Sequence, residues 1–164
     1  MKTQTIFDGN IVVIDAMVII NFHGLLAFEK LISWAKKELV VEKRVRGEAK
    51  SSLVGPIDLA PYIADQSMSE EEISGEEQEK LFYYYFNRQI GKTRIHEADA
   101  ACLALAISKG YGLASDERAL REEFKIKCPN KICIHSWCIV DKAQGLGLID
   151  KEEADNLKKG FYYV

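Results

Sequence analysis

Four acidic residues stand where carboxylates could act together on a metal ion. They are Asp15, Glu48, Asp99 and Asp116. Carboxylates held close together repel one another and raise each other's pKa values, and a divalent cation relieves this repulsion. Mg²⁺ and Mn²⁺ prefer oxygen ligands, and such an ion polarises a phosphate and lowers the pKa of a bound water. These residue types therefore indicate metal-dependent phosphodiester hydrolysis, for which no side-chain nucleophile is needed.

Each of the four acids also has a simple structural explanation when it is taken alone. Asp15 and Asp116 could each cap a following helix, and Asp99 could interact with a helix dipole in a first turn. Glu48 could be a surface ion-pair partner of the basic residues around it. The four acids together, in this order of strands and helices, favour a shared site.

The strand pattern predicts that two of the acids meet at one edge of a parallel sheet. Residues 11–15 are a β-branched run ending in Asp15, which is typical of a strand buried on both faces. Residues 111–115 form a second short strand, and Asp116 follows it directly. Ligands bind beyond the carboxyl ends of parallel strands. We therefore expect both carboxylates at that edge.

Helices are predicted to bring in the other two acids. Residues 95–109 form an alanine-rich helix ending at Gly110, and its small side chains would let Asp99 approach the sheet. Glu48 falls in a charged helix expected at residues 42–51, and its side chain is long enough to reach the same edge.

The remaining segments complete an alternation of strands and helices. This alternation predicts an α/β fold whose parallel sheet is covered by helices on both faces. The acidic segment 67–79 is expected to be a solvated loop that leads into a helix, with Ser69 and Glu72 as a capping box. The other expected elements are helices at 18–37, 76–89, 117–125, 136–144 and 151–159, strands at 39–41 and 131–135, and an extended piece at 57–64.

The composition is that of a single globular domain over residues 1–164. Hydrophobic residues make up 48% and charged residues 29%, and the length is enough for one core. The net charge of -3 indicates that nucleic acid would be held by local basic groups or bridging metal ions. The sequence has no apolar segment long enough to span a membrane and no signal-peptide pattern, so we expect a cytoplasmic location.

The four cysteines, at positions 102, 128, 133 and 138, form no Cys-x-x-Cys pair and are expected to be free thiols. Cys128, Cys133, His135 and Cys138 lie close together in sequence. A zinc site there is one alternative, although the spacing fits no common zinc pattern. The other alternative is that the cysteines are simply small apolar residues on a strand and a helix.

Local basic residues could contact phosphates around the acidic site, or they could simply solvate helix faces. The aromatic run 82–86 could stack on bases, but its spacing is more typical of packing into a core or a dimer interface. The candidate phosphate contacts are Lys43, Arg44, Arg46, Lys50, Lys92, Arg94, Arg118 and Arg121.

The order of four short motifs resembles the PIN-domain family, which includes prokaryotic toxin ribonucleases of the VapC type. The first is a hydrophobic strand that ends in Asp, and the second closes a short helix with an acid. The third is similar to the Gly-Glu-Ala-Glu-Ala of one branch, and the fourth is a strand followed by Ser or Thr and Asp. The resemblance is weakest over residues 55–94. The matching segments are residues 11–20, 41–48, 96–104 and 113–119, with a tail from 131 to 149.

The resemblance implies a three-layer PIN-like fold with a central parallel sheet. It implies a Mg²⁺- or Mn²⁺-dependent endoribonuclease that hydrolyses RNA, as the toxin component of a toxin–antitoxin pair. An antitoxin protein and a second copy of the chain in a homodimer are the implied partners. By position, Asp15, Asp99 and Asp116 would bind the metal, Glu48 would complete the acidic pocket, Ser115 could orient a carboxylate or water, and Glu97 could be an extra ligand.

Three positions depart from the family pattern. Ala16 and Met17 stand where a small polar residue usually follows the first Asp, and His96 replaces a common glycine. These changes motivate an alternative function, a catalytically weak PIN-like domain that binds protein or RNA. Another alternative is phosphoryl transfer with Asp15 as nucleophile, but the second acid that such enzymes need two residues later is Met17 here.

Overall fold

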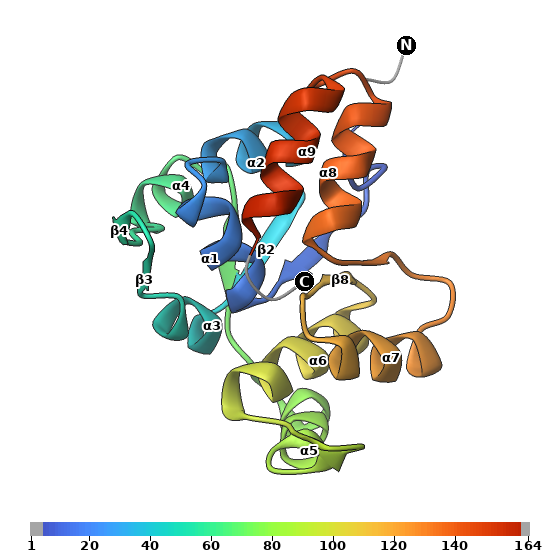
Figure 1. Ribbon diagram of the computed structural model, residues 1–164. Helices are drawn as coiled ribbons and strands as arrows, with labels where there is room; N and C mark the ends of the chain where they lie inside the picture. Colours follow the sequence, from blue (N-terminus) through green and yellow to red (C-terminus); the bar gives the residue numbers. More distant parts are fainter. Residues whose placement is uncertain (1–4, 162–164) are drawn as a thin grey trace.

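The computed structural model describes residues 5–161, and a five-stranded parallel sheet lies at its centre (Figure 1). The strand order is β5-β2-β1-β8-β9, and each neighbouring pair is parallel. The prediction of a parallel sheet flanked by helices is confirmed. The strands are β1 (Val12–Ile14), β2 (Leu39–Glu42), β5 (Ser69–Glu71), β8 (Gly112–Ala114) and β9 (Cys133–Ile134).

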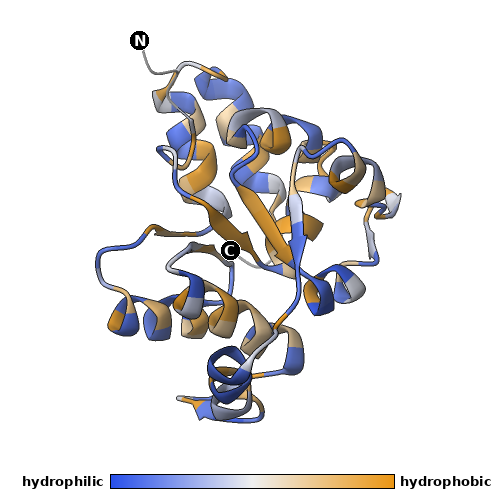
Figure 2. Ribbon diagram, turned by 180° about the vertical axis from the view of Figure 1, so that it is seen from behind, coloured by the Kyte–Doolittle hydropathy of each residue, from blue (hydrophilic) through white to orange (hydrophobic). Residues whose placement is uncertain are grey.

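Hydrophobic sequence places β1, β2 and β8 in the middle of the sheet, where every residue of each strand is buried. Figure 2 shows these central strands as hydrophobic, whereas the edge strand β5 is hydrophilic. The first residue of β8, Gly112, has no room for a side chain, because a Cβ there would lie 2.9 Å from the carbonyl oxygen of Ile132. The close approach of β8 to its neighbours therefore requires glycine.

Helices cover both faces of the sheet (Figure 1). On one face α6 packs against β1, β2 and β8, with α7 and α5 packed against α6. On the other face α1 packs against α2 and α8, and α8 packs against α9. The helices are α1 (Ala16–Gly24), α2 (Phe28–Ala35), α3 (Lys43–Glu48), α4 (Ala60–Ala64), α5 (Glu76–Tyr85), α6 (Glu97–Lys109), α7 (Arg118–Lys127), α8 (Ser136–Gly145) and α9 (Lys151–Gly160).

The alanine-rich helix α6 is the element that the sequence described best. It begins at Glu97 and ends at Lys109, and Gly110 caps it in the left-handed conformation with φ of 69°. All residues from Ala100 to Ala106 are buried. These small side chains let α6 lie close against the sheet, as expected.

The single helix expected over residues 18–37 was wrong, because the segment forms two helices. The first ends at Gly24 and the second begins at Phe28, and the pair is bent by 120°. Between them Leu26 takes a left-handed conformation with φ of 57°, which ends the helical geometry. The apolar pattern continues through the bend because both helices contribute side chains to the same core.

Two segments between β2 and α5 also differ from expectation. The piece at 57–64 was expected to be extended, but Ala60–Ala64 form α4, with proline in its first turn where the missing N–H costs little. Ser69–Glu71 were expected to belong to a solvated loop with a capping box, but they form β5, which pairs with β2. The following helix begins instead after Gly75.

Two short antiparallel hairpins complete the fold, formed by β3 (Ser51–Ser52) with β4 (Gly55–Pro56) and by β6 (Gln89–Ile90) with β7 (Thr93–Arg94).

Taken one at a time, the helices within residues 5–161 are too short or too polar to cross a membrane. The bent pair α1 and α2 meets the same length and composition criteria only when its two helices are counted together.

Candidate active site

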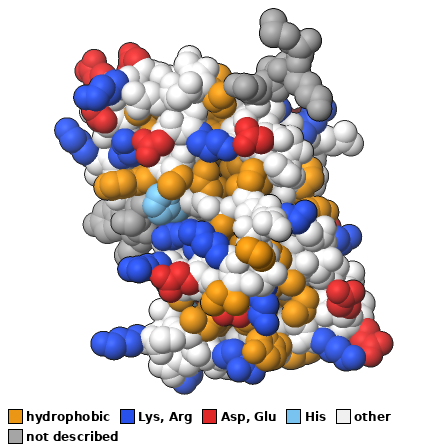
Figure 3. All heavy atoms as spheres, turned by 90° about the vertical axis from the view of Figure 1, so that its right-hand side faces the viewer, with side chains coloured by type: hydrophobic (Ala, Val, Ile, Leu, Met, Phe, Trp, Pro, Cys, Tyr) orange, Lys and Arg blue, Asp and Glu red, His pale blue; other side chains and the backbone are white. Residues whose placement is uncertain are grey.

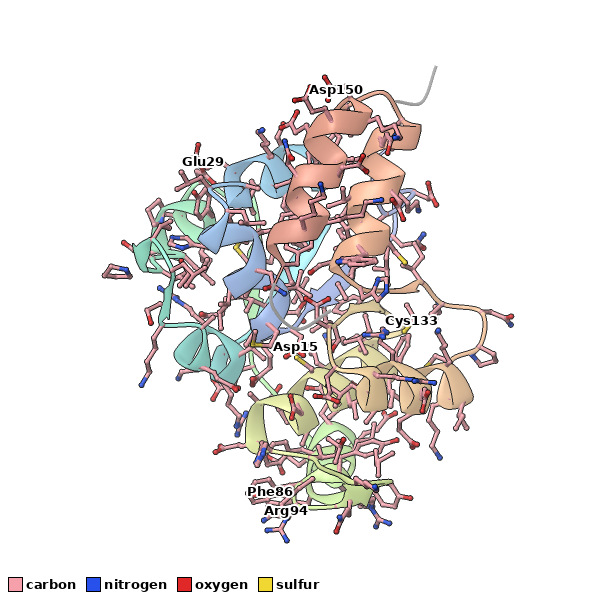
Figure 4. The ribbon with its side chains drawn as sticks, in the orientation of Figure 1. Asp15, Glu29, Phe86, Arg94, Cys133 and Asp150 are labelled. Carbon is pink, nitrogen blue, oxygen red and sulfur yellow. The ribbon has the colours of Figure 1, made fainter. Side chains whose placement is uncertain are left out.

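Acidic side chains follow or end three neighbouring strands at the carboxyl edge of the sheet. Asp15 comes directly after β1, Asp116 lies two residues beyond β8, and Glu42 is the last residue of β2. Because the strands are parallel, these ends meet at one edge. Figure 4 shows Asp15 near the centre of the molecule, where this edge meets the helices. The predicted placement of Asp15 and Asp116 is confirmed.

Asp15 is almost fully buried, with 3% of its surface exposed. Its Oδ1 accepts a 2.8 Å hydrogen bond from the backbone N–H of Ala16, so Asp15 also caps α1. Its Oδ2 accepts a 2.8 Å hydrogen bond from Oγ of Ser115. This is the orienting contact to a carboxylate expected for Ser115. The capping and functional explanations of Asp15 are therefore compatible.

Asp116 is held by three hydrogen bonds from two residues that the sequence analysis did not select. The Ser136 N–H donates to Oδ1 at 2.7 Å, and the Ser136 hydroxyl donates to Oδ2 at 2.6 Å. The amide of Asn21 donates to Oδ2 at 2.7 Å. Ser136 lies two residues beyond β9, just as Asp116 lies two residues beyond β8, so the rule of carboxyl strand ends could have found it. Asn21 is a buried amide in a helix that is otherwise apolar apart from His23, and that was its only signal.

Asp99 and Glu48 approach from helices, as predicted. Asp99 is half-buried in the first turn of α6, where its Oδ2 accepts a 3.3 Å hydrogen bond from the backbone N–H of His96. Glu48 is exposed at the end of α3. α3 packs against α6. The charge of Glu48 acts on both Asp15 and Asp99, which places the carboxylates in one electrostatic group.

Burial and mutual repulsion raise the pKa values of two members of this group. Burial is the largest cause for Asp15 and raises its pKa to about 6, helped by the charges of Glu48 and Asp116 and opposed by its hydrogen bonds. Burial also raises the pKa of Asp99 to about 7, helped by the charges of Asp15, Glu48 and Glu117. These carboxylates would gain from a cation, because a positive charge favours their ionised form.

The donor chemistry of this group fits a hard divalent cation. All its donors are carboxylate oxygens, and each carboxylate oxygen has two lone pairs. Oδ2 of Asp15 keeps one free lone pair, whereas its Oδ1 accepts from the Ala16 N–H and faces Sγ of Cys102 at 4.0 Å; the hydrogen bonds to Asp116 leave one lone pair on its Oδ1. However, no three His, Cys, Asp or Glu side chains within residues 5–161 already converge as metal ligands. Ion binding would therefore require side chains to move, and the exposed Glu48 has the most freedom to do so.

Arg44 and Glu97 interact with each other beside the acidic group. Nε of Arg44 lies 3.0 Å from Oε1 of Glu97, and Nη1 of Arg44 lies 2.8 Å from Oε1 of Glu42. Glu42 is fully buried and also accepts a hydrogen bond from the backbone N–H of Arg44. Glu97, expected as an extra ligand, thus pairs with an arginine, and Arg44, expected as a phosphate contact, has its charge engaged within the protein. Glu42 was not selected from the sequence.

The other basic candidates divide into paired and unpaired groups. Carboxylates pair with Arg46, Lys43 and Arg118, and the guanidinium of Arg121 donates to the carbonyl oxygen of Ser115 at 2.9 Å. The charges of these residues are therefore engaged in contacts within the protein. In the described part of the chain, ion pairs are absent for Lys50, Lys92 and Arg94.

A groove of about 380 Å³ lies beside the acidic group. It runs between α3 and the start of α6, and its lining includes Arg44, Glu48, His96 and Glu97. Met17, by contrast, lies in an apolar pocket of about 240 Å³ together with Ile20, Leu25 and Leu53. Met17 thus contributes to an apolar surface.

The cysteines are free thiols, as expected. Nδ1 of His135 accepts a 3.2 Å hydrogen bond from the backbone N–H of Cys138 and caps α8. Sγ of Cys133 lies 3.7 Å from the carbonyl oxygen of Arg121. The expected zinc alternative has no preformed three-ligand group among the described residues.

Comparisons of this chain with protein-family models, with curated proteins and with solved structures give no match.

Proposed function

We propose that this chain is a PIN-like endoribonuclease that depends on Mg²⁺ or Mn²⁺ and hydrolyses RNA phosphodiester bonds. Asp15, Asp99 and Asp116 would bind the metal, and Glu48 would complete the acidic pocket. The observation that carries the proposal is that these four carboxylates, which come from four elements at the carboxyl edge of the sheet, form one electrostatic group. Two of them have pKa values raised to about 6 and about 7, and strongly shifted acids are typical of functional sites.

The chain's own residues would orient the site. Ser115 and the Ala16 N–H fix both oxygens of Asp15. Asn21 and Ser136 fix Asp116 in the same way. A bound divalent cation would polarise the phosphate and lower the pKa of an attacking water. Such orienting contacts hold ligand oxygens in place before the substrate arrives, which reduces the cost of reorganisation.

The biological setting that accompanies this proposal is that of a cytoplasmic toxin with an antitoxin protein and a homodimeric state. Support for this part comes from the motif resemblance alone. Co-expression with the product of an adjacent gene, followed by size-exclusion chromatography with light scattering, tests both partners. A stable complex that suppresses RNA cleavage supports the antitoxin, and a free chain of monomer mass contradicts the homodimer.

A catalytically weak PIN-like binding module is the second candidate, and two observations favour it. The side chain of Met17, at a position where a polar group would be expected, lines an apolar pocket. The carboxylates also lack a ready three-ligand arrangement within residues 5–161. This candidate predicts RNA or protein binding without metal-stimulated cleavage. Calorimetric titration with Mn²⁺ discriminates, since only the nuclease requires the ion.

Cleavage of end-labelled single-stranded RNA tests the leading proposal. The protein is assayed with Mn²⁺, with Mg²⁺ and with a chelator, beside Asp15→Asn and Asp116→Asn. Asp141→Asn is the matched control, because Asp141 is exposed on α8. We expect cleavage with either ion, none with the chelator, and a loss of at least about 100-fold in the two site variants. Unchanged cleavage in both folded site variants would overturn the proposal.

A further inference from the structure

An acid-free segment leads directly into the acidic site. From Lys80 to His96 the sequence has four lysine or arginine residues and five aromatic residues, but no Asp or Glu. This contrasts with the whole chain, whose net charge is -3. The segment forms the second half of α5 and the β6–β7 hairpin, and Asp99 follows it in the first turn of α6.

The aromatic run divides into an anchoring pair and an exposed group. Phe82 and Tyr85 are 5% and 0% exposed, and the hydroxyl of Tyr85 donates a 3.0 Å hydrogen bond to Oε1 of Glu123 on α7. Tyr83 and Tyr84 are 69% and 47% exposed, and Phe86 is 38% exposed. The expectation that the run packs into the core therefore holds for two of its residues, while three rings remain on the surface.

Three cations follow the exposed rings in the sequence, and one of them contacts a ring. The guanidinium of Arg88 lies 3.8 Å from the centroid of the Tyr84 ring. The backbone N–H of Ile95 donates to the carbonyl oxygen of Arg88, and that of Asn87 donates to the carbonyl oxygen of Ile95, each at 2.9 Å, so the hairpin is held to the end of α5. Lys92 and Arg94 project from that hairpin, and both are exposed. None of the three forms an ion pair with a carboxylate of the described chain.

The pictures place these groups together at one end of the molecule. Figure 4 shows Phe86 and Arg94 both at its lower end, below the level of Asp15. Basic and hydrophobic side chains also interleave at the lower end of Figure 3, the end that α5 occupies in Figure 1. We define the α5–hairpin surface as Tyr83, Tyr84, Phe86, Arg88, Lys92 and Arg94.

A chain of contacts connects this surface to the acidic site. The Phe86 ring stacks on Phe82, with centroids 5.7 Å apart and planes within 9°. The Arg44 guanidinium lies 4.7 Å from the centroid of Phe82. Arg44 in turn pairs with Glu97 and lines the groove beside Glu48. The exposed ring of Phe86 is therefore two side-chain contacts away from Arg44, which lines the groove at the acids.

We propose that the α5–hairpin surface binds single-stranded RNA and guides it to the acidic site. This inference rests on the proposed nuclease function. Bases would stack on the exposed rings, and phosphates would contact the three unpaired cations. Single strands are favoured over duplexes because a duplex hides the faces of its bases. A second copy of the chain is disfavoured, since a two-fold dimer would bring this cationic surface against itself.

Binding is measured without catalysis, so that the two proposals can fail separately. The probe is a fluorescein-labelled single-stranded RNA of about 12 nucleotides, within the usual footprint of stacking platforms. Fluorescence anisotropy is followed in a chelator over a series of KCl concentrations. The variants are Lys92→Gln with Arg94→Gln, and Tyr83→Ser with Tyr84→Ser. The control is Lys36→Gln with Lys37→Gln, two exposed cations at the opposite, amino end of β2.

We expect the control to bind like the unchanged protein. The lysine–arginine variant removes two cations. Because each phosphate contact contributes about 0.7 to the slope of log affinity against log salt for a single strand, the slope should become shallower by about 1.4. The tyrosine variant should lose at least about fivefold in affinity. Equal binding by all folded proteins overturns the inference, even if RNA cleavage persists. Dissociation of a dimer by the tyrosine variant, with RNA binding unchanged, also overturns it. If the surface variants weaken RNA binding but the unchanged protein cleaves no RNA with Mn²⁺ or Mg²⁺, the RNA-binding surface is supported and the nuclease proposal is refuted.

Discussion

The side-chain amide of Asn21 donates a 2.7 Å hydrogen bond to Oδ2 of Asp116, across 95 residues of sequence. Asn21 lies in α1, which begins at the Asp15 cap, so one short helix touches two of the four acids. The contact is buried, with Asn21 5% and Asp116 8% exposed. Asn21 therefore couples the position of Asp116 to the end of β1.

Replacement of Asn21 should affect activity more than a purely structural residue would. Asn21→Ala removes one of the three hydrogen bonds that orient Asp116, so we expect RNA cleavage to fall by roughly 10- to 100-fold. The free energy of unfolding should fall by about 1 to 3 kcal/mol. Ser136→Ala, which removes one hydroxyl donor to the same oxygen, should act in the same direction. A higher Mn²⁺ concentration needed for half-maximal cleavage is the readout of positioning, and an unchanged requirement would contradict it.

Stability should fall as the pH rises through the window in which Asp15 and Asp99 titrate. Their folded pKa values are about 6 and about 7, against 3.8 for the unfolded chain. Between about pH 4 and pH 7 the folded state therefore holds protons that the unfolded state has released, so a higher pH favours unfolding. The shift of Asp15 alone corresponds to about 3 kcal/mol.

Asp99→Asn should therefore stabilise the metal-free protein at about pH 8, by roughly 1 to 3 kcal/mol, and flatten its pH profile. Urea denaturation from about pH 4 to pH 8 measures both effects. Asp141→Asn is the control, because Asp141 is exposed and pairs with Lys158 outside the acidic group. A stability profile of Asp99→Asn parallel to that of the unchanged protein would show that Asp99 carries no raised pKa.

The buried Glu42 makes Arg44 more important to stability than its neighbour Arg46. Arg44→Met leaves the carboxylate of Glu42, which is 0% exposed, without its charged partner. We expect a loss of about 3 kcal/mol, less than for a fully buried pair because Arg44 is 31% exposed. Arg46→Met breaks a pair with Glu70 in which both side chains are partly exposed, 36% and 27%, so no fully buried charge is left alone and the change should cost about 1 kcal/mol or less.

The two arginine variants are compared by chemical denaturation. Adding Glu42→Gln to Arg44→Met should recover part of the loss, because the uncompensated charge is then removed. Equal losses for Arg44→Met and Arg46→Met would contradict the buried-charge explanation.

Glycine is required at position 112 by the spacing of the central strands. An added Cβ would lie 2.9 Å from the Ile132 carbonyl oxygen and 3.1 Å from Cγ2 of Val12. Gly112→Ala should lower the free energy of unfolding by about 1 to 3 kcal/mol. The matched variant Gly145→Ala, at the end of α8 where a Cβ meets nothing within 4 Å, should be neutral or slightly stabilising. The thermal unfolding of both variants is compared with that of the unchanged protein. A Gly112→Ala variant as stable as the unchanged protein would mean that the strands move apart at little cost.

The parts of the fold that could be predicted are those with a strong hydrophobic signal. The buried strand before Asp15 and the alanine-rich helix around Asp99 both carry such patterns, and they fix two of the acids in space. The carboxyl-edge rule then placed Asp116. Glu48 was placed because its helix follows the next strand along the sheet.

The parts that were missed depend on interactions distant in sequence. β5 reads Ser-Glu-Glu, and only pairing with β2 makes it a strand. The bend at Leu26 was missed although Gly24 lies two residues before it, because apolar residues continue on both sides of the bend. The roles of Asn21 and Ser136 could not be predicted, because only the folded chain brings them within hydrogen-bond distance of Asp116. Periodicity cannot predict these contacts, because they join side chains across separate elements.

The most direct test of the acidic site is a crystal of the protein soaked in Mn²⁺ and measured for anomalous scattering. We expect an anomalous peak bound by carboxylate oxygens of Asp15, Asp99 and Asp116, with Glu48 moved toward it, and no peak in crystals of Asp15→Asn. Occupancy at carboxylates elsewhere, with none between these three aspartates at saturating Mn²⁺, would contradict it.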